Sequence, residues 1–194
     1  MKKETVLLVV IAVVVGLLVG ILVSKSGRPR ATLPAAGPTA PTVNTQEQIR
    51  VLQDLVAREP GNRNAWVQLG HLYFDTNQSV QSVEAYNRAL ALDPNDPDVL
   101  TDQGIMFRQL GWFDKAIENF NQASRINPNH PQSLFNLGVV YRYDLNDFPA
   151  AIEAWNRFLQ ITPTGPGADQ IRAEINFMQS HPQTPGAPSA PGGR

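Results

Sequence analysis

The 194-residue sequence contains no cysteine, which excludes disulfide bonds, thiol nucleophiles and zinc–thiolate sites. Charge is also scarce, since only 17% of the residues are Asp, Glu, Lys or Arg. Beyond residue 30 the chain is mildly acidic, and its only lysine there is Lys115. Binding to nucleic acid needs clustered lysine and arginine, so the composition predicts no nucleic-acid partner.

Patterns that carry catalysis or metal binding are missing as well. The three histidines stand alone, without metal-ligand spacing: His71, His130 and His181. No glycine-rich phosphate loop follows a predicted strand, and no strand pattern is visible. Asp144–Asp147 resembles the start of a calcium loop but lacks its glycine and its closing glutamate. We therefore expect a protein that is not an enzyme, with no catalytic residue, cofactor or metal.

One long apolar run is present near the start of the chain, after a short basic segment at residues 1–4. Residues 5–23 contain no charged side chain, and as a helix they would span about 28 Å, roughly one hydrocarbon thickness. A cleaved signal peptide is the alternative, but its apolar region is usually about 7–15 residues and ends at an A-x-A-like site. The run is longer and lacks that site, which favours an uncleaved transmembrane helix in contact with the lipid bilayer.

The residues around this apolar run say less about its orientation and its partners. Basic residues flank it almost equally, so the charge count does not fix its orientation. By analogy with anchors that have a short basic start, we expect a cytoplasmic N-terminus. Gly16 and Gly20 could seat a second helix, which leaves a homo-oligomer possible. Residues 24–44 are rich in proline and alanine and predict a tether, and residues 182–194 predict a disordered tail.

The middle of the chain repeats itself at a constant spacing. Three consecutive segments, 63–96, 97–130 and 131–165, share the same order of small, aromatic and proline residues. In the second segment these are Leu100, Gly104, Phe107, Ala116, Phe120, Ala123 and Pro128. The spacing predicts two helices per segment, and neighbouring pairs must stack because one pair cannot bury its own apolar face.

The pattern resembles the tetratricopeptide repeat (TPR) family, in which each unit has W…LG…Y, then A…F…A and P. The sequence departs from this pattern at Ser82, Gln103, Trp155 and Phe158. The third unit also has one extra residue, which we place in the turn Tyr143–Pro149. We expect this insertion to splay the third helix pair. The resemblance implies an all-α superhelix of three helix pairs. Small residues would let paired helices approach closely: Gly70, Gly104, Gly138, Ala116 and Ala151.

Two more helices are expected at the ends of the repeats. Thr45-Gln46-Glu47-Gln48 has the form of a capping box with Thr45 as N-cap, and it begins a lead-in helix at residues 45–60. This helix resembles the second helix of a preceding unit whose first helix is missing. After a break at residues 163–167, residues 168–180 have one apolar and one polar face, typical of a capping helix. The predicted domain, residues 45–181, thus contains eight helices.

The resemblance also implies a concave groove, lined by the first helices, that holds a protein or peptide. The implied groove residues are Val67, His71, Phe74, Ile105, Arg108, Phe135, Val139, Arg142 and Tyr143. Arg108 and Arg142 occupy equivalent places and could jointly hold a carboxylate, or could pair with Asp75 or remain solvated. The Lys and Asn residues that clamp chaperone tails in one TPR subfamily are absent.

The order of anchor, tether and repeats is similar to that of bacterial envelope assembly factors, including TPR subunits of cytochrome c maturation and accessory subunits of the secretion translocon. This resemblance implies an interaction module in the inner (cytoplasmic) membrane, with its repeats in the periplasm. A self-associating scaffold at the membrane and a chaperone-like accessory subunit of the translocon remain alternatives.

Overall fold

The computed structural model describes residues 44–181. The predicted basic start, the transmembrane helix at 5–23, the tether as far as residue 43 and the tail at 182–194 lie outside the described residues. Among the residues that are described, no helix is both long and apolar enough to cross a membrane.

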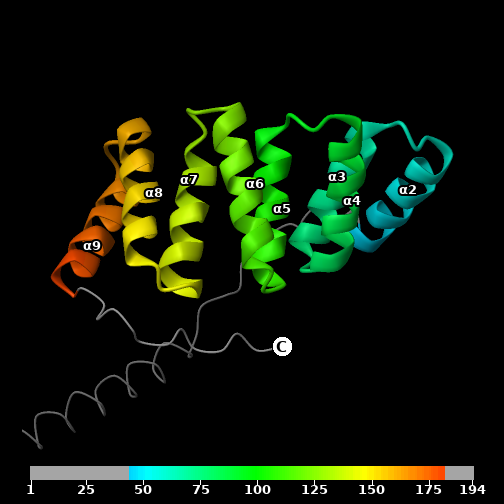
Figure 1. Ribbon diagram of the computed structural model, residues 1–194. Coiled ribbons are helices and arrows are strands. Elements are labelled where there is room, and N and C mark those ends of the chain that lie inside the picture. Colours follow the sequence, from blue (N-terminus) through cyan, green and yellow to red (C-terminus); the bar gives the residue numbers. More distant parts are fainter. Residues whose placement is uncertain (1–43, 182–194) are drawn as a thin grey trace, which may run out of the picture. The chain divides into compact units, whose positions relative to one another are not determined.

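Residues 44–181 fold into helices that follow one another in a row, from α2 to α9 (Figure 1). The elements are α2 (Thr45–Arg58), α3 (Arg63–Asp75), α4 (Ser79–Leu92), α5 (Pro97–Gln109), α6 (Phe113–Ile126), α7 (Pro131–Val139), the π-helical turn η1 (Val140–Asp144), α8 (Phe148–Ile161) and α9 (Pro166–Ser180). Within this range there are eight α-helices and no strand, so the all-helical prediction is confirmed for the described part.

The helix pairs α3/α4, α5/α6 and α7/α8 correspond to the three repeats. In each pair the turn between the helices contains one residue with a left-handed backbone: Asn77 (φ 56°), Gly111 (φ 75°) and Asn146 (φ 55°). Glycine and asparagine adopt this conformation more readily than other residues, which explains why they recur at this place. This tight turn lets the second helix run antiparallel to the first.

Three predicted features of the helix ends differ from the structure. The N-cap of α2 is Asn44 and not Thr45, because the Asn44 side chain accepts a hydrogen bond from the backbone N–H of Gln46 at 3.1 Å. This helix ends at Arg58, two residues before Pro60, which biases Glu59 away from helical geometry. The last helix begins earlier than predicted, at Pro166, because proline suits the first position of a helix.

The extra residue of the third repeat lies in η1 and not in the turn after Tyr143. The backbone N–H of Leu145 donates to the carbonyl of Val140 at 3.0 Å, a bond that spans five residues and marks one wide helical turn. At its glycine contact this helix pair is not splayed. Trp155 of α8 still lies against Gly138 of α7, as in the other repeats.

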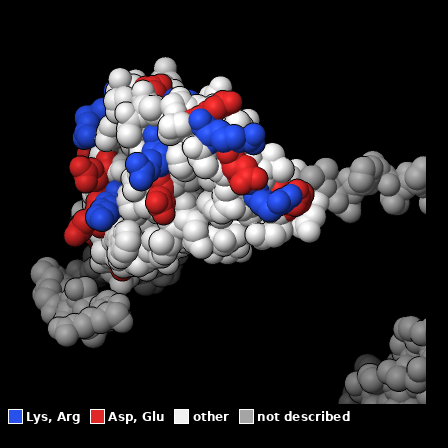
Figure 2. All heavy atoms as spheres, turned by 90° about the vertical axis from the view of Figure 1, so that its right-hand side faces the viewer, with Lys and Arg blue, Asp and Glu red and all other residues white. Residues whose placement is uncertain are grey.

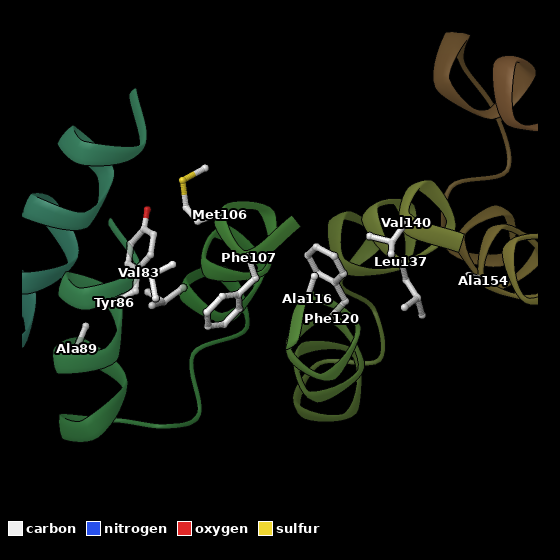
Figure 3. Packing of buried hydrophobic residues seen from close by; sticks show 11 residues of the cluster. Val83, Tyr86, Ala89, Met106, Phe107, Ala116, Phe120, Leu137, Val140 and Ala154 are labelled. Carbon is white, nitrogen blue, oxygen red and sulfur yellow. The ribbon is translucent and has the colours of Figure 1, made fainter. Parts of the chain in front are cut away.

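Each repeat is held together by an aromatic ring on a glycine. Tyr86 packs on Gly70, Phe120 on Gly104 and Trp155 on Gly138, and a Cβ at these glycines would lie 2.4, 2.5 and 2.1 Å from the ring. Ala116 and Ala151 are fully buried beside these contacts. Figure 3 shows the central cluster of the core, which extends from Val83 of α4 to Ala154 of α8.

The departure from the family pattern at Gln103 is explained by a buried amide network. Its side-chain NH₂ donates to Asn87 at 2.8 Å, and its oxygen accepts from Asn119 at 2.8 Å. Gln103 is 3% exposed and Asn119 is 9% exposed, so water does not compete strongly for these bonds. The network links α4, α5 and α6 where leucine would make only apolar contacts.

Candidate protein-binding face

The residues implied to line the groove come from α3, α5, α7 and η1, and their exposure varies. His71, Phe135 and Tyr143 are exposed. The others are half-buried: Val67, Phe74, Ile105, Arg108, Val139 and Arg142. Among these, Val67, Phe74 and Ile105 pack against the central core cluster. The apolar surface left for a partner is therefore concentrated toward the C-terminal part of the face.

A series of pairs between basic and acidic side chains joins consecutive first helices, and we call it the ion-pair ladder. His71 of α3 pairs with Asp102 of α5, Arg108 of α5 with Asp144 of η1, and Arg142 of η1 with Glu174 of α9. Each pair includes a contact of 3.2 Å. The ladder runs across three repeat junctions, and each pair uses its charges within the chain.

Arg108 and Arg142 therefore occupy separate rungs of the ladder. Arg108 donates to Asp144 through two nitrogens, and Asp75 is not its partner. The Arg142 guanidinium lies 4.7 Å from the centre of the Phe148 ring and 5.2 Å from that of Phe177. The sequence pattern placed the two arginines equivalently, but it could not reveal Asp144 as a partner, because the π-helical turn brings that side chain into range.

The His71–Asp102 rung is the titratable one near neutral pH. The hydrogen bond to Asp102 is the largest influence on the His71 imidazole and raises its pKa above the ordinary value of 6.5. Partial burial acts in the opposite direction, and the charges of Asp102, Asp75 and Asp96 add to the rise. The protonated imidazole is thus favoured in the folded protein.

Three aromatic side chains give the C-terminal part of the face its exposed apolar surface. Phe135 is 38% exposed, Tyr143 is 49% exposed and Phe177 is 46% exposed. Sequence reasoning missed Phe177, because it lies on the capping helix, beyond the last complete repeat. The apolar stripe of α9 is marked by Ile171 and Ile175, and Phe177 does not belong to it. Aromatic groups of this kind supply much of the free energy at protein interfaces.

A hollow at the other end of the array lies between α2 and α3. It has a volume of about 530 Å³ and is lined by Glu47, Gln48, Val51, Leu52, Gln68, His71 and Leu72. Of the predicted groove residues only His71 lines it. The hollow is therefore a separate feature of the surface.

The described residues contain no cluster that could hold a metal ion, and the α2 end of the array carries charges of both signs. Within residues 44–181 no group of three His, Asp or Glu side chains could hold a metal ion. Figure 2 looks onto the α2 end of the array, where basic and acidic side chains are interleaved. This end of the array therefore presents no continuous basic surface of the kind that binds a nucleic acid backbone.

Stacked antiparallel helix pairs with a glycine–aromatic contact in each pair define an α-helical repeat protein. Models of the tetratricopeptide repeat match residues 64–96, 85–118 and 132–164, and a further TPR model matches residues 104–141. Together these matches extend without a gap from residue 64 to residue 164. The chain is a tetratricopeptide repeat protein.

Solved structures share this fold. The crystal structure of MamA has 20% sequence identity and a TM-score of 0.66, with 71% of this chain and 78% of that chain covered. A tetratricopeptide repeat protein from Parabacteroides merdae has 19% identity and a TM-score of 0.64, covering 71% and 54%. PilF of Pseudomonas aeruginosa has 20% identity and a TM-score of 0.62, covering 71% and 63%. No curated protein matches the sequence.

Proposed function

We propose that this protein is a membrane-tethered module that binds another protein during assembly of the bacterial cell envelope. The observation that supports binding is the set of exposed aromatic side chains at Phe135, Tyr143 and Phe177. Tyr143 and Phe177 contact Arg142, which belongs to a ladder whose charges are already paired. A partner with apolar anchors suits such a surface, because it displaces water without having to break ion pairs.

The membrane tether is supported by the sequence of residues 5–23. This uncharged run is long enough to cross the hydrocarbon core as a helix. The proline-rich residues that follow suit a spacer between the bilayer and the repeats. The inner membrane and a periplasmic repeat domain are part of this proposal.

Envelope assembly is supported by the order of anchor, spacer and repeats, which resembles that of TPR assembly factors in cytochrome c maturation and secretion. Such a likeness of architecture does not identify the partner, whereas the exposed aromatic residues indicate how the partner would bind. We expect the partner to insert apolar side chains between α7 and α9.

Site-specific photocrosslinking in intact cells tests the proposal. A photoreactive amino acid in place of Phe135 should capture a defined partner, whereas the same group in place of exposed Val80 on α4 should not. Crosslinking is preferable to charge reversal of Arg108 or Arg142, because reversal would also disrupt their pairs within the fold. Identical products from Phe135 and Val80 would contradict the assigned face.

Membrane attachment is tested by fractionation of the same cells. The full-length chain should stay in the membrane fraction after alkaline carbonate washing, and a chain without residues 5–23 should appear in the soluble fraction. Protease added to spheroplasts should cut the repeat domain if it lies in the periplasm. Release of the full-length chain by carbonate would argue against the tether.

A further inference from the structure

Three exposed rings gather at the point where the described part of the chain ends. The Arg142 guanidinium lies 5.1 Å from the centre of the Tyr143 ring and 5.2 Å from that of Phe177, so both rings border the same side chain. The His181 ring stacks on Phe177, with 4.5 Å between the ring centres and 21° between the ring planes. All three rings are exposed to solvent. We call Tyr143, Phe177 and His181 the aromatic patch.

The charge at the centre of the aromatic patch is already satisfied. Arg142 pairs with Glu174 at 3.2 Å, and their side chains are only 15% and 29% exposed. A charged ligand would have to compete with this pair, whereas an uncharged one could cover the rings and leave the pair intact. The patch therefore favours a neutral, apolar occupant.

The residues that follow His181 have a regular proline pattern. Proline occurs at every third residue, and residues 182–193, which we call the proline segment, contain no charged side chain. The prolines are Pro182, Pro185, Pro188 and Pro191. Because a polyproline II helix has three residues per turn, this spacing would place all four rings on one edge of such a helix. Surfaces lined with aromatic side chains bind proline edges of this kind.

The proline segment also begins at the aromatic patch. It continues directly from His181, whose ring belongs to the patch. As a polyproline II helix, residues 182–193 would extend about 37 Å. Phe135, the other exposed ring of this face, precedes Tyr143 by eight residues, or about 12 Å along a helix axis. The segment is thus long enough to cover the patch and to reach Phe135.

We propose that the proline segment binds the aromatic patch of its own chain as a polyproline II helix, and that the partner protein must displace it. The inference rests on the proposed function and adds a regulation of the same face. The segment is covalently attached beside its site, and a short connection of this kind gives a millimolar effective concentration. A weak contact is therefore sufficient to occupy the patch until a partner with stronger apolar anchors arrives.

The proline-rich residues at the other end of the chain suit this role less well. Pro29, Pro34, Pro38 and Pro41 are spaced five, four and three residues apart, so no single polyproline II edge holds them all. They also precede α2, which lies at the opposite end of the row from α9 (Figure 1). These residues therefore provide a control of similar composition.

Photocrosslinking within the full-length chain in mild detergent tests the contact. A photoreactive amino acid in place of Ala187, between two prolines of the segment, should link to α7, η1 or α9. The same group in place of Ala36, between Pro34 and Pro38, should not link to these elements. Mass spectrometry identifies the linked fragments, and a mixture of ¹⁴N- and ¹⁵N-labelled chains separates links within a chain from links between chains.

Substitutions in the proline segment test its proline edge. Pro185→Ala combined with Pro188→Ala should lower the yield of the Ala187 link about fivefold, because two apolar contacts are truncated. Gln183→Ala combined with Ser189→Ala is the matched control, since it changes two residues of the segment and keeps every proline. The control should leave the yield unchanged.

A second pair of variants tests the aromatic patch. Phe177→Ser should lower the yield of the Ala187 link, because it removes a ring of the patch. Trp112→Ser is the matched control, since Trp112 is 46% exposed, like Phe177, but lies at the start of α6 and outside the patch. In cells, the two proline substitutions should increase the capture of a partner from Phe135, because they free the face.

The outcomes separate this inference from the proposed function. No link from Ala187 to α7, η1 or α9, or equal yields from the wild-type and Phe177→Ser chains, would overturn the contact. Links found only between differently labelled chains would also overturn it and assign the patch to a second copy. Capture from Phe135 that the proline substitutions leave unchanged would overturn the regulation. The Ala187 link without any capture from Phe135 would support the contact and refute the proposed function.

Discussion

The three glycines Gly70, Gly104 and Gly138 fix how closely the helices of each repeat approach. Each faces an aromatic ring that is buried and cannot retreat into solvent. The contact at Gly138 is the most constrained, because the Trp155 indole N–H also donates to the carbonyl of Phe135 at 3.1 Å. A ring that is held by a hydrogen bond cannot shift freely to admit an added methyl group.

Replacing Gly138 with alanine should therefore destabilise the protein. The new Cβ would lie 2.1 Å from the Trp155 indole nitrogen, and overpacking of this kind costs about 1–3 kcal/mol, more than the helix propensity gained from alanine. Gly61→Ala is the control, since a Cβ there meets nothing within 4 Å, and it should be neutral or slightly stabilising. Urea unfolding of both variants measures the difference. Equal midpoints would contradict the close contact.

The amide network around Gln103 gives a second residue-scale prediction. Gln103→Leu restores the family pattern but removes a partner from Asn119, whose buried amide then loses one hydrogen bond. We expect a loss of about 1–2 kcal/mol of unfolding free energy. In the double variant with Asn119→Leu the loss should be smaller than the sum of the single losses, because neither amide is left unpaired. Additive losses in a double-mutant cycle would show that the two side chains are not coupled.

At the scale of the elements, the ion-pair ladder connects each first helix to the next. Its pairs are partly exposed, so each contributes little stability by itself. Their effect is to neutralise the charges of the face and to hold Arg108 and Arg142 in defined positions. The π-helical turn takes part, since Asp144 belongs to it.

The His71–Asp102 rung should make stability depend on pH. Because the pKa of His71 is raised in the folded state, its contribution is complete below about pH 6.5 and is lost as the pH rises through the folded value. The change should stay under about 1 kcal/mol, since solvent screens a pair of which His71 is half-exposed. His71→Gln should remove this part of the slope between pH 6 and 8 in urea unfolding. An unchanged slope would assign it to other groups.

The repeat elements were predictable from the sequence, whereas the irregular ones were not. Glycine, aromatic and proline residues at a fixed spacing indicate the helix pairs, because each residue type has one steric role there. The extra residue was misplaced because a π-helical turn has no distinctive composition, and Asp144 and Tyr143 look like ordinary turn and helix residues. The partners of Arg108 and Arg142 followed from that turn, so periodicity alone could not reveal them.

At the scale of the molecule, the described repeats form a row in which each unit depends on its neighbours. Stability in such arrays is approximately a sum of the repeats and their interfaces. The helices α5 and α6 are flanked on both sides, whereas α2 has one close helical neighbour among residues 44–181 and exposes Val51. The ends of the row are therefore unequal, because α9 closes the other end with a polar face and buried apolar residues.

Hydrogen exchange should show this inequality along the chain. Amides of α2 should exchange fastest, those of α5 and α6 slowest and those of α9 at an intermediate rate, because local opening costs less where fewer neighbours are lost. Mass spectrometry of peptic fragments resolves these regions. Uniform exchange would mean that the whole row opens as one cooperative unit. It would contradict the expectation that α2, with fewer neighbours, opens locally at a lower free energy.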